Sequence, residues 1–211
     1  MGLLLDKEIV GLLDVNAYLL FDDETARAVL VDPGGDLDRI EAMVHRRGAQ
    51  VEAVVATHGH VDHVGGVAEA CRRFQAPFWI HAMEASVLDS IPLQARLFGF
   101  PGAQKPEAQR WLNDGETFAI GHSQVCVIAT PGHTPGGICL YAEAARLLLT
   151  GDTLFVGDVG RSDLPGGDGA QLARSIREKL YTLPAGISFY PGHGPSGSLD
   201  RERSTNPFVR S

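Results

Sequence analysis

Three histidines and one aspartate fall within six consecutive residues of this chain, in the order His-Gly-His-Val-Asp-His beginning at His58. The valine- and alanine-rich segment 51–57 precedes them and predicts a strand that ends at His58. In an extended chain His58 and His60 project to the same side, whereas Asp62 and His63 begin the helix that we expect next. The chain must therefore fold so that four polar side chains gather where a strand gives way to a helix.

Three later segments repeat one format, in which an apolar strand is followed by a glycine and a polar side chain. Strand ends in stacked sheets open onto a common crevice, and the glycines let the backbone approach closely there. We therefore expect one site that gathers seven side chains, namely His58, His60, Asp62, His63, His133, Asp152 and His193.

Five histidines and two aspartates suit borderline divalent ions, zinc first and iron or manganese also, and their number fits two ions. Two dications bring +4, the two aspartates −2 and a bridging hydroxide −1, which leaves +1 to polarise a substrate oxygen. Two metals about 3.5 to 4 Å apart produce hydroxide near neutral pH and stabilise the oxyanion that its attack forms. No serine or cysteine nucleophile is then needed, and the chain has no Gly-x-Ser-x-Gly motif.

A structural role for these residues is the alternative. A lone His133 or His193 would more often be a surface or core histidine than a ligand, but the cluster that begins at His58 rarely serves packing. Structural zinc sites are usually closed and rich in cysteine, so we expect an open, catalytic centre.

The composition of the chain limits the kinds of molecule that it is expected to bind. Lysine and arginine number 18 against 26 acidic residues, a formal net charge of −8, which argues against a nucleic-acid partner. Cys71, Cys126 and Cys139 form no Cys-x-x-Cys pair and are expected to be buried, reduced thiols. Residues 1–13 lack the features of a secretory signal, and no apolar run approaches the roughly 18 residues of a membrane span. We therefore expect a cytoplasmic protein without a membrane partner.

The periodicity predicts strands and helices in two halves of similar character. Asp36 is a candidate N-cap for a helix that ends at Gly48, and residues 90–110 are predicted to be an irregular lid or binding loop. The other predicted strands are 17–21, 27–31, 78–81, 116–120, 125–130, 138–141, 147–150 and 187–190, and the other predicted helices are 64–74 and the stretch that contains Leu172, Ile176 and Leu180. This order predicts a layered α/β or α+β fold of two packed sheets with helices outside.

The His-x-His-x-Asp-His segment and its three downstream partners resemble the metallo-β-lactamase superfamily over essentially the whole chain. The resemblance implies an αββα sandwich of two mixed sheets, and it equates Asp32 with an aspartate that supports the ligands. Asp32 fits a turn or a helix cap equally well. The resemblance further implies a ligand assignment, with His58, His60 and His133 on the first metal, Asp62, His63 and His193 on the second, and Asp152 bridging.

Closer similarity is to the short bacterial hydrolases related to type II glyoxalase, the hydroxyacylglutathione hydrolases. It is carried by residues 111–115, 160–168, 191–195 and 205–208. The similarity implies hydrolysis of a small-molecule thioester such as S-lactoylglutathione. A thiol leaves as a thiolate with a pKa of about 8.5 and needs little help from an acid. Asp62 would orient or deprotonate the attacking water.

The chain departs from the longer type II glyoxalases where those proteins bind glutathione. Their lysine and tyrosine after the bridging aspartate are replaced here by Arg161 and Asp163, and a later tyrosine by Pro195. The chain ends 18 residues after His193, so we expect a single domain, 1–211, without their carboxyl-terminal helical domain. Arg161 could bind a substrate carboxylate, but we favour a salt bridge within its loop.

Two other functions fit the same residues. Persulfide dioxygenases of the superfamily hold one iron on two histidines and an aspartate, here His58, His133 and Asp152, and carry a similar Gly-Arg-Thr-Asp segment. A metal-binding protein without catalysis is the third possibility, which the complete set of ligands argues against. The sequence leaves monomer and homodimer open.

Overall fold

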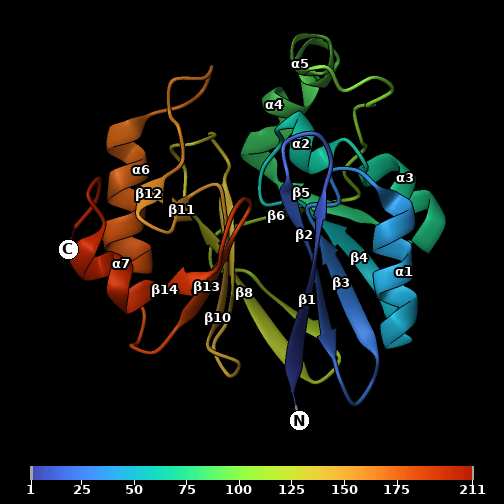
Figure 1. Cartoon of the computed structure of the whole chain (residues 1–211), viewed down its shortest axis with the longest axis horizontal. Helices are drawn as coiled ribbons and strands as arrows, with labels where there is room; N and C mark the ends of the chain where they lie inside the picture. Colours follow the sequence, from blue (N-terminus) through green and yellow to red (C-terminus); the bar gives the residue numbers. More distant parts are fainter. Residues whose placement is uncertain (1, 211) are drawn as a thin grey trace.

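The computed structural model describes residues 2–210 and contains two six-stranded sheets that pack face to face, with helices outside them (Figure 1). The strands of the first sheet are, in spatial order, β1 (Leu3–Val10), β2 (Val15–Asp22), β3 (Arg27–Val31), β4 (Gln50–Val55), β5 (Phe78–His81) and β6 (Arg110–Leu112). The pairs among β1, β2 and β3 are antiparallel, and those from β3 to β6 are parallel.

The second sheet is also mixed. Its strands are, in spatial order, β14 (Gly197–Ser198), β13 (Ser188–Pro191), β10 (Leu147–Gly151), β9 (Ile138–Ala142), β8 (Ser123–Ala129) and β7 (Thr117–Ile120). Only β10 and β13 pair in parallel in the described part of this sheet. A small hairpin of β11 (Leu154–Phe155) and β12 (Asp158–Val159) follows β10.

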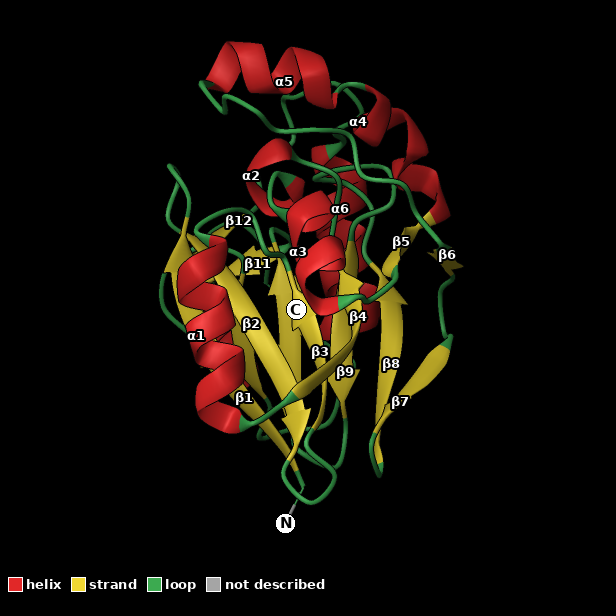
Figure 2. Cartoon of the chain, turned by 90° about the vertical axis from the view of Figure 1, so that its right-hand side faces the viewer, coloured by secondary structure: helices red, strands yellow, loops and turns green. Residues whose placement is uncertain are grey.

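Some helices cover the outer face of each sheet, and others lie beyond the ends of the strands (Figure 1). They are α1 (Leu37–Arg47), α2 (Val61–Val64), α3 (Val67–Phe74), α4 (Ala85–Asp89), α5 (Ile91–Phe98), α6 (Gly169–Ser175) and α7 (Leu199–Thr205), with a 3-10 turn at Ala82–Glu84 and a π-helix at Ile176–Leu180. Figure 2 shows α1 and α3 in front of the first sheet, and Figure 1 shows α6 and α7 beside the second. No helix within residues 2–210 is long and apolar enough to cross a bilayer.

Three apolar clusters hold the four layers together. Successive side chains of a strand point to opposite faces, so Leu19 of β2 joins Ile40 of α1 in the outer cluster, whereas the adjacent Leu20 joins Leu140 of β9 between the sheets. A third cluster joins the second sheet to α6. Burial on both faces explains why β2 is apolar along its length and why the helices lie outside. The predicted αββα sandwich is confirmed.

Several predicted elements differ from the structure at glycine and proline. Residues 91–98, predicted to be irregular, form helix α5, because Pro92 lies in the first turn, where a missing N–H costs nothing. The predicted helix 64–74 is interrupted at Gly65 and Gly66, so Val64 ends α2 and Val67 begins α3, and a Cβ at Gly66 would overlap the carbonyl oxygen of Pro33. Strand β1 was not predicted from the sequence.

Two side-chain predictions are also corrected. Asp36 precedes α1, but its backbone is left-handed and its carboxylate accepts a hydrogen bond from the Gly11 nitrogen at 2.9 Å instead of capping the helix. The three cysteines are free, but only Cys139 is buried, while Cys71 and Cys126 are half-buried. Cys126 alternates on β8 with side chains that face the core, which explains its partial exposure.

Candidate metal centre

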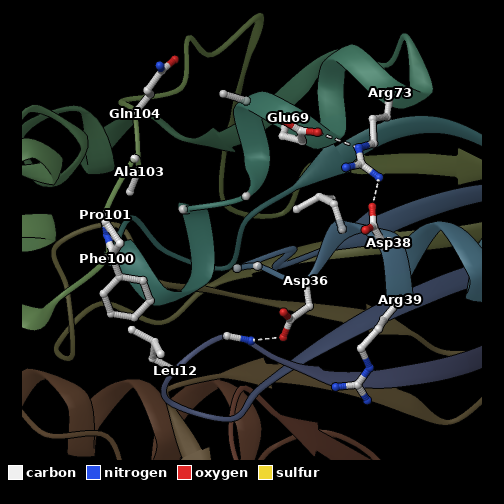
Figure 3. A pocket seen from close by; sticks show the side chains of 18 of the residues that line it. Leu12, Asp36, Asp38, Arg39, Glu69, Arg73, Phe100, Pro101, Ala103 and Gln104 are labelled. Atoms are coloured by element: carbon white, nitrogen blue, oxygen red, sulfur yellow. Dashed lines mark hydrogen bonds and ion pairs between the residues drawn. The ribbon is translucent and has the colours of Figure 1, made fainter.

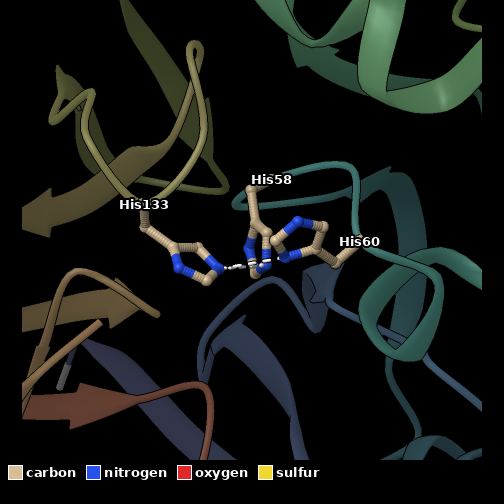
Figure 4. A group of neighbouring side chains, drawn as sticks. All are labelled: His58, His60 and His133. Atoms are coloured by element: carbon tan, nitrogen blue, oxygen red, sulfur yellow. Dashed lines mark hydrogen bonds between the residues drawn. The ribbon is translucent and has the colours of Figure 1, made fainter. Parts of the chain in front are cut away.

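Two histidines from the loop after β4 and one from the loop after β8 point at a common centre (Figure 4). The Nε2 atom of His133 lies 3.3 Å from Nε2 of His58 and 3.0 Å from Nδ1 of His60. Two nitrogens bound to tetrahedral zinc at about 2.0 to 2.1 Å lie roughly 3.3 Å apart. The three ring nitrogens therefore have the spacing of ligands around one metal ion.

A second group forms where α2 meets the loop after β13. The Nε2 atom of His193 lies 3.3 Å from Nε2 of His63 and 3.3 Å from Oδ2 of Asp62, and the last two atoms are 3.6 Å apart. The sequence prediction that Asp62 and His63 begin a helix holds, and the helix turns both side chains toward His193. This triangle also has the dimensions of a metal site.

Asp152 follows β10 and lies between the two groups. Its Oδ1 is 3.5 Å from Nε2 of His63, and its Oδ2 is 3.7 Å from Nε2 of His133 and 3.6 Å from Nε2 of His193. Buried Oδ1 has no hydrogen-bond partner among residues 2–210, which is costly unless a cation satisfies it. The residues therefore fit a pair of divalent ions that share the Asp152 carboxylate.

The backbone at Gly192 packs tightly against the Asp152 side chain. A Cβ atom on Gly192 would overlap Oδ1 of Asp152 and crowd the His63 ring. Glycine at this position lets the loop after β13 approach the loop after β10, where the Gly192 nitrogen donates to the carbonyl of Gly151 at 2.8 Å.

Carbonyl oxygens orient two of the imidazoles. Nδ1 of His133 donates to the carbonyl of Arg161 at 2.7 Å, and Nδ1 of His193 donates to the carbonyl of Leu13 at 2.9 Å. A ring that donates through Nδ1 keeps Nε2 free of a proton when it is neutral. These contacts therefore aim the unprotonated nitrogens at the centre.

Asp32 orients a third imidazole and anchors the ligand loop. Its carboxylate accepts hydrogen bonds from Nδ1 of His63 at 3.0 Å and from both the backbone nitrogen and the hydroxyl of Thr57 at 2.7 Å. The Thr57 hydroxyl in turn lies 3.1 Å from Nδ1 of His58. Asp32 thus supports two ligand histidines, and it is not a helix cap.

The two groups differ in electrostatics. Burial lowers the pKa of His58 well below its ordinary value, and burial together with His133 lowers the pKa of His60 to about 3. Burial alone would lower the pKa of His63 too, but the carboxylates of Asp152, Asp62 and Asp32 outweigh it and raise that pKa to about 10. Neutral imidazoles on one side and a strong preference for positive charge on the other suit a site that takes up cations.

Glu84, in the turn before α4, is a supporting residue that the sequence analysis missed. Its buried carboxylate accepts the backbone N–H of Gly59 and of Gly136, each at 2.6 Å. It thereby ties the loop of His58 and His60 to the loop that follows His133. Nothing in the sequence marks this glutamate, because both partners are backbone groups distant along the chain.

The predicted salt bridge of Arg161 within its loop is present. Its Nε and Nη2 atoms lie 2.8 and 2.9 Å from the two carboxylate oxygens of Asp163. Its side chain also lines a cavity of about 620 Å³ that opens onto His60, Asp62 and Asp152. Arg161 is therefore both paired with Asp163 and part of the wall of the cavity at the candidate centre.

A larger cavity of about 890 Å³ lies on the helical face, between the amino ends of α1 and α3 and the loop after α5 (Figure 3). Its charged side chains are engaged with one another or with β1: Arg73 contacts Glu69 and Asp38, and Arg39 contacts Glu8. The seven residues with ligand spacing do not line it.

Comparisons with known proteins agree with this geometry. The family model of the metallo-beta-lactamase superfamily matches residues 10–193. The hydroxyacylglutathione hydrolase GloC of Haemophilus influenzae is 34% identical over 198 residues, which cover 93% of this chain and 93% of that protein.

Two solved structures superpose closely on the chain. BLEG-1, a B3 metallo-beta-lactamase, has a TM-score of 0.91 at 33% identity and covers 99% of this chain and 100% of its own. TTHA1623 in a di-iron-bound form has a TM-score of 0.88 at 35% identity, with 97% and 100% covered. The resemblance in the sequence is confirmed: the chain belongs to the metallo-beta-lactamase superfamily and is an enzyme of the hydrolase type.

Proposed function

We propose that this protein is a hydrolase of small-molecule thioesters, of the S-lactoylglutathione type, that works with two divalent metal ions. The observation that carries the proposal is Asp152, whose carboxylate lies between two groups with ligand spacing at the base of one cavity. The thioester class is supported by the similarity to GloC, which is named a hydroxyacylglutathione hydrolase.

The seven side chains would hold the ions in two sets, with His58, His60 and His133 in the first, Asp62, His63 and His193 in the second, and Asp152 shared. Zinc suits these imidazole and carboxylate donors, and iron is the alternative that the di-iron form of TTHA1623 supports. Bound ions would supply a hydroxide nucleophile at neutral pH and polarise the thioester carbonyl.

Asp62 has a second task beside the metals. Burial would raise its pKa, but His63 and His193 outweigh that effect and hold the pKa well below its ordinary value. An ionised carboxylate on the cavity wall accepts a hydrogen bond from the attacking water and orients it toward the acyl carbon. The leaving thiolate, with a pKa of about 8.5, needs no protein acid.

The test measures metal content and turnover of S-lactoylglutathione on the same sample. We expect about two metal ions per chain, loss of turnover on chelation, and loss of turnover in His60→Ala and Asp152→Ala. Unchanged turnover in either variant would contradict the proposal. Oxygen uptake with glutathione persulfide on a protein that holds one iron would instead indicate a persulfide dioxygenase, and full metal loading without turnover of any thioester would indicate a metal-binding protein without catalysis.

A further inference from the structure

The cavity above the candidate centre has a mostly apolar wall. Nine of its lining residues are apolar side chains outside the metal-ligand set, namely Leu13, Val61, Val87, Leu93, Leu97, Phe98, Pro135, Leu164 and Pro165. The cavity volume of about 620 Å³ falls in the range of small-molecule sites. The chemistry of this wall therefore bears on what substrate enters.

Helix α5 supplies the most exposed part of the wall. The side chains of Leu93, Leu97 and Phe98 are 57%, 69% and 47% exposed. Leu93 and Leu97 are four residues apart, so they share one face of the helix. Among the described residues, eleven large apolar side chains are exposed, and these three and Leu13 line this one cavity. Such a concentration of exposed apolar surface marks a contact site for an apolar group.

Two polar side chains on the same wall, Ser90 and Gln94, already have partners. The Gln94 side chain accepts the Val61 N–H at 2.9 Å and donates to the Ser90 hydroxyl at 2.8 Å, and that hydroxyl donates to the Val87 carbonyl at 2.7 Å. These groups hold α4, α5 and α2 together. They offer few free donors for a polar substrate arm.

The charged side chains of the wall also favour an apolar substrate group over a highly charged one. Arg161 is the only lysine or arginine among the described lining residues, and it is paired with Asp163. Glutathione carries two carboxylates. A glutathione thioester would therefore meet only one cation on this wall, and that cation already forms a salt bridge. Arg161 lies after β12 of the second half, whereas α5 lies over the first sheet (Figure 1). Leu93, Leu97 and Phe98 thus bring apolar surface to the cavity from α5, and Arg161 brings its positive charge from the segment after β12.

We infer that this site prefers thioesters with an apolar acyl chain, which lies along Leu93, Leu97 and Phe98 while the thiol arm extends toward Arg161. The inference rests on the proposed thioester hydrolysis. In the reaction, water adds its oxygen to the acyl carbon and the carbon–sulfur bond breaks with its electron pair on sulfur. The products are a carboxylate, a thiol and one proton. The carbonyl would lie beside the residues that would hold the metal ions, and the acyl chain would contact α5, which would thereby distinguish chain lengths.

The test holds the thiol constant and varies the acyl group. The metal-loaded protein is assayed with glutathione thioesters of acetate, butanoate, hexanoate and octanoate. Each methylene that leaves water is expected to raise kcat/KM by up to about fourfold. The double variant Leu93→Gln/Leu97→Gln should lose this rise with acyl chain length. Leu4→Gln is the matched control, because Leu4 is 44% exposed on β1 and does not line the cavity.

The outcomes separate the two proposals. A series that rises in the protein and the control and is flat in the double variant supports the inference. Rates that stay flat or fall with chain length overturn it and leave thioester hydrolysis intact. A rise that survives in the double variant overturns the assignment to α5. Absence of turnover for every thioester would contradict the proposed function itself.

Discussion

The Oε2 atom of Glu84 lies 2.6 Å from the backbone nitrogen of Gly59, the residue between His58 and His60. The other carboxylate oxygen accepts from Gly136, three residues after His133. One buried carboxylate therefore sets the distance between the loop of His58 and His60 and the loop of His133.

Glu84→Gln is expected to weaken metal binding by His58, His60 and His133 by roughly 10- to 100-fold, the range typical of residues that support metal ligands. The amide can accept only one of the two backbone hydrogen bonds, so one loop is released. A competition titration with a chelator measures the effect. Glu202→Gln is the control, because Glu202 is also buried and accepts a backbone N–H, that of Gly157 at 2.9 Å, but does not join the loops that carry His58, His60 and His133. Equal metal affinity in both variants would refute the role of Glu84.

The gathering of the seven side chains with ligand spacing could be predicted from the sequence and the role of Glu84 could not, for a physical reason. A ligand must follow the end of a strand, and the glycine beside it leaves a pattern that recurs near His58, His133, Asp152 and His193. Glu84 acts on backbone N–H groups, which every residue except proline offers. Its burial depends on how the 3-10 turn Ala82–Glu84 packs on the loops of His58, His60 and His133, and a local sequence pattern does not record such packing.

Helix α5 shows a different limit. Prolines at 92, 101 and 106 read together as an irregular stretch, yet Pro92 lies in the first turn of a helix that continues to Phe98. Proline is favoured in the first turn of a helix but disrupts a helix interior. Its effect therefore depends on where the helix begins. The leucines of α5 face a cavity instead of a core, so their spacing did not mark a packed face.

Gly192→Ala is expected to lower metal affinity and turnover more than backbone strain in this loop alone would lower them. The added methyl group would displace the Asp152 carboxylate, whose Oδ1 occupies that space. Gly194→Ala separates the two effects, because Gly194 has a φ of 74° and open space around its Cβ position, so alanine there costs only about 1 to 2 kcal/mol of backbone strain. Metal content and unfolding midpoint are measured for both variants. Similar metal loss in the two would show that loop strain, not the methyl contact, is responsible.

Asp22 is expected to make the fold sensitive to acid. Burial would raise its pKa, but hydrogen bonds from Thr25, from the His122 nitrogen and from Glu24 outweigh it and lower the pKa from 3.8 to about 2. A carboxyl group with a lowered folded pKa contributes stability above its unfolded pKa and loses it as the pH falls through the folded value. Asp22→Asn should therefore be less stable than the parent at pH 7, and the difference should shrink between pH 4 and pH 2.

Urea unfolding of metal-free protein at several pH values measures this difference without interference from metal release. Asp23→Asn is the control, because Asp23 is exposed and accepts one hydrogen bond, from the nitrogen of Gly2. A stability difference for Asp22→Asn that stays constant from pH 7 to pH 2 would contradict the assignment.

The pair of Arg161 and Asp163 predicts opposite effects on substrate affinity. An exposed salt bridge is worth about 0 to 1 kcal/mol, so releasing Arg161 from Asp163 can strengthen its contact with a substrate carboxylate by up to roughly fivefold. Asp163→Asn should lower KM for S-lactoylglutathione and leave kcat unchanged, whereas Arg161→Ala should raise KM. Neither variant should change KM for a thioester of N-acetylcysteamine, which has no carboxylate. Arg27→Ala, which removes a salt bridge to Glu52 away from the cavity, is the control. If KM for S-lactoylglutathione stays the same in both variants, Arg161 serves its loop alone and the thiol arm is held elsewhere.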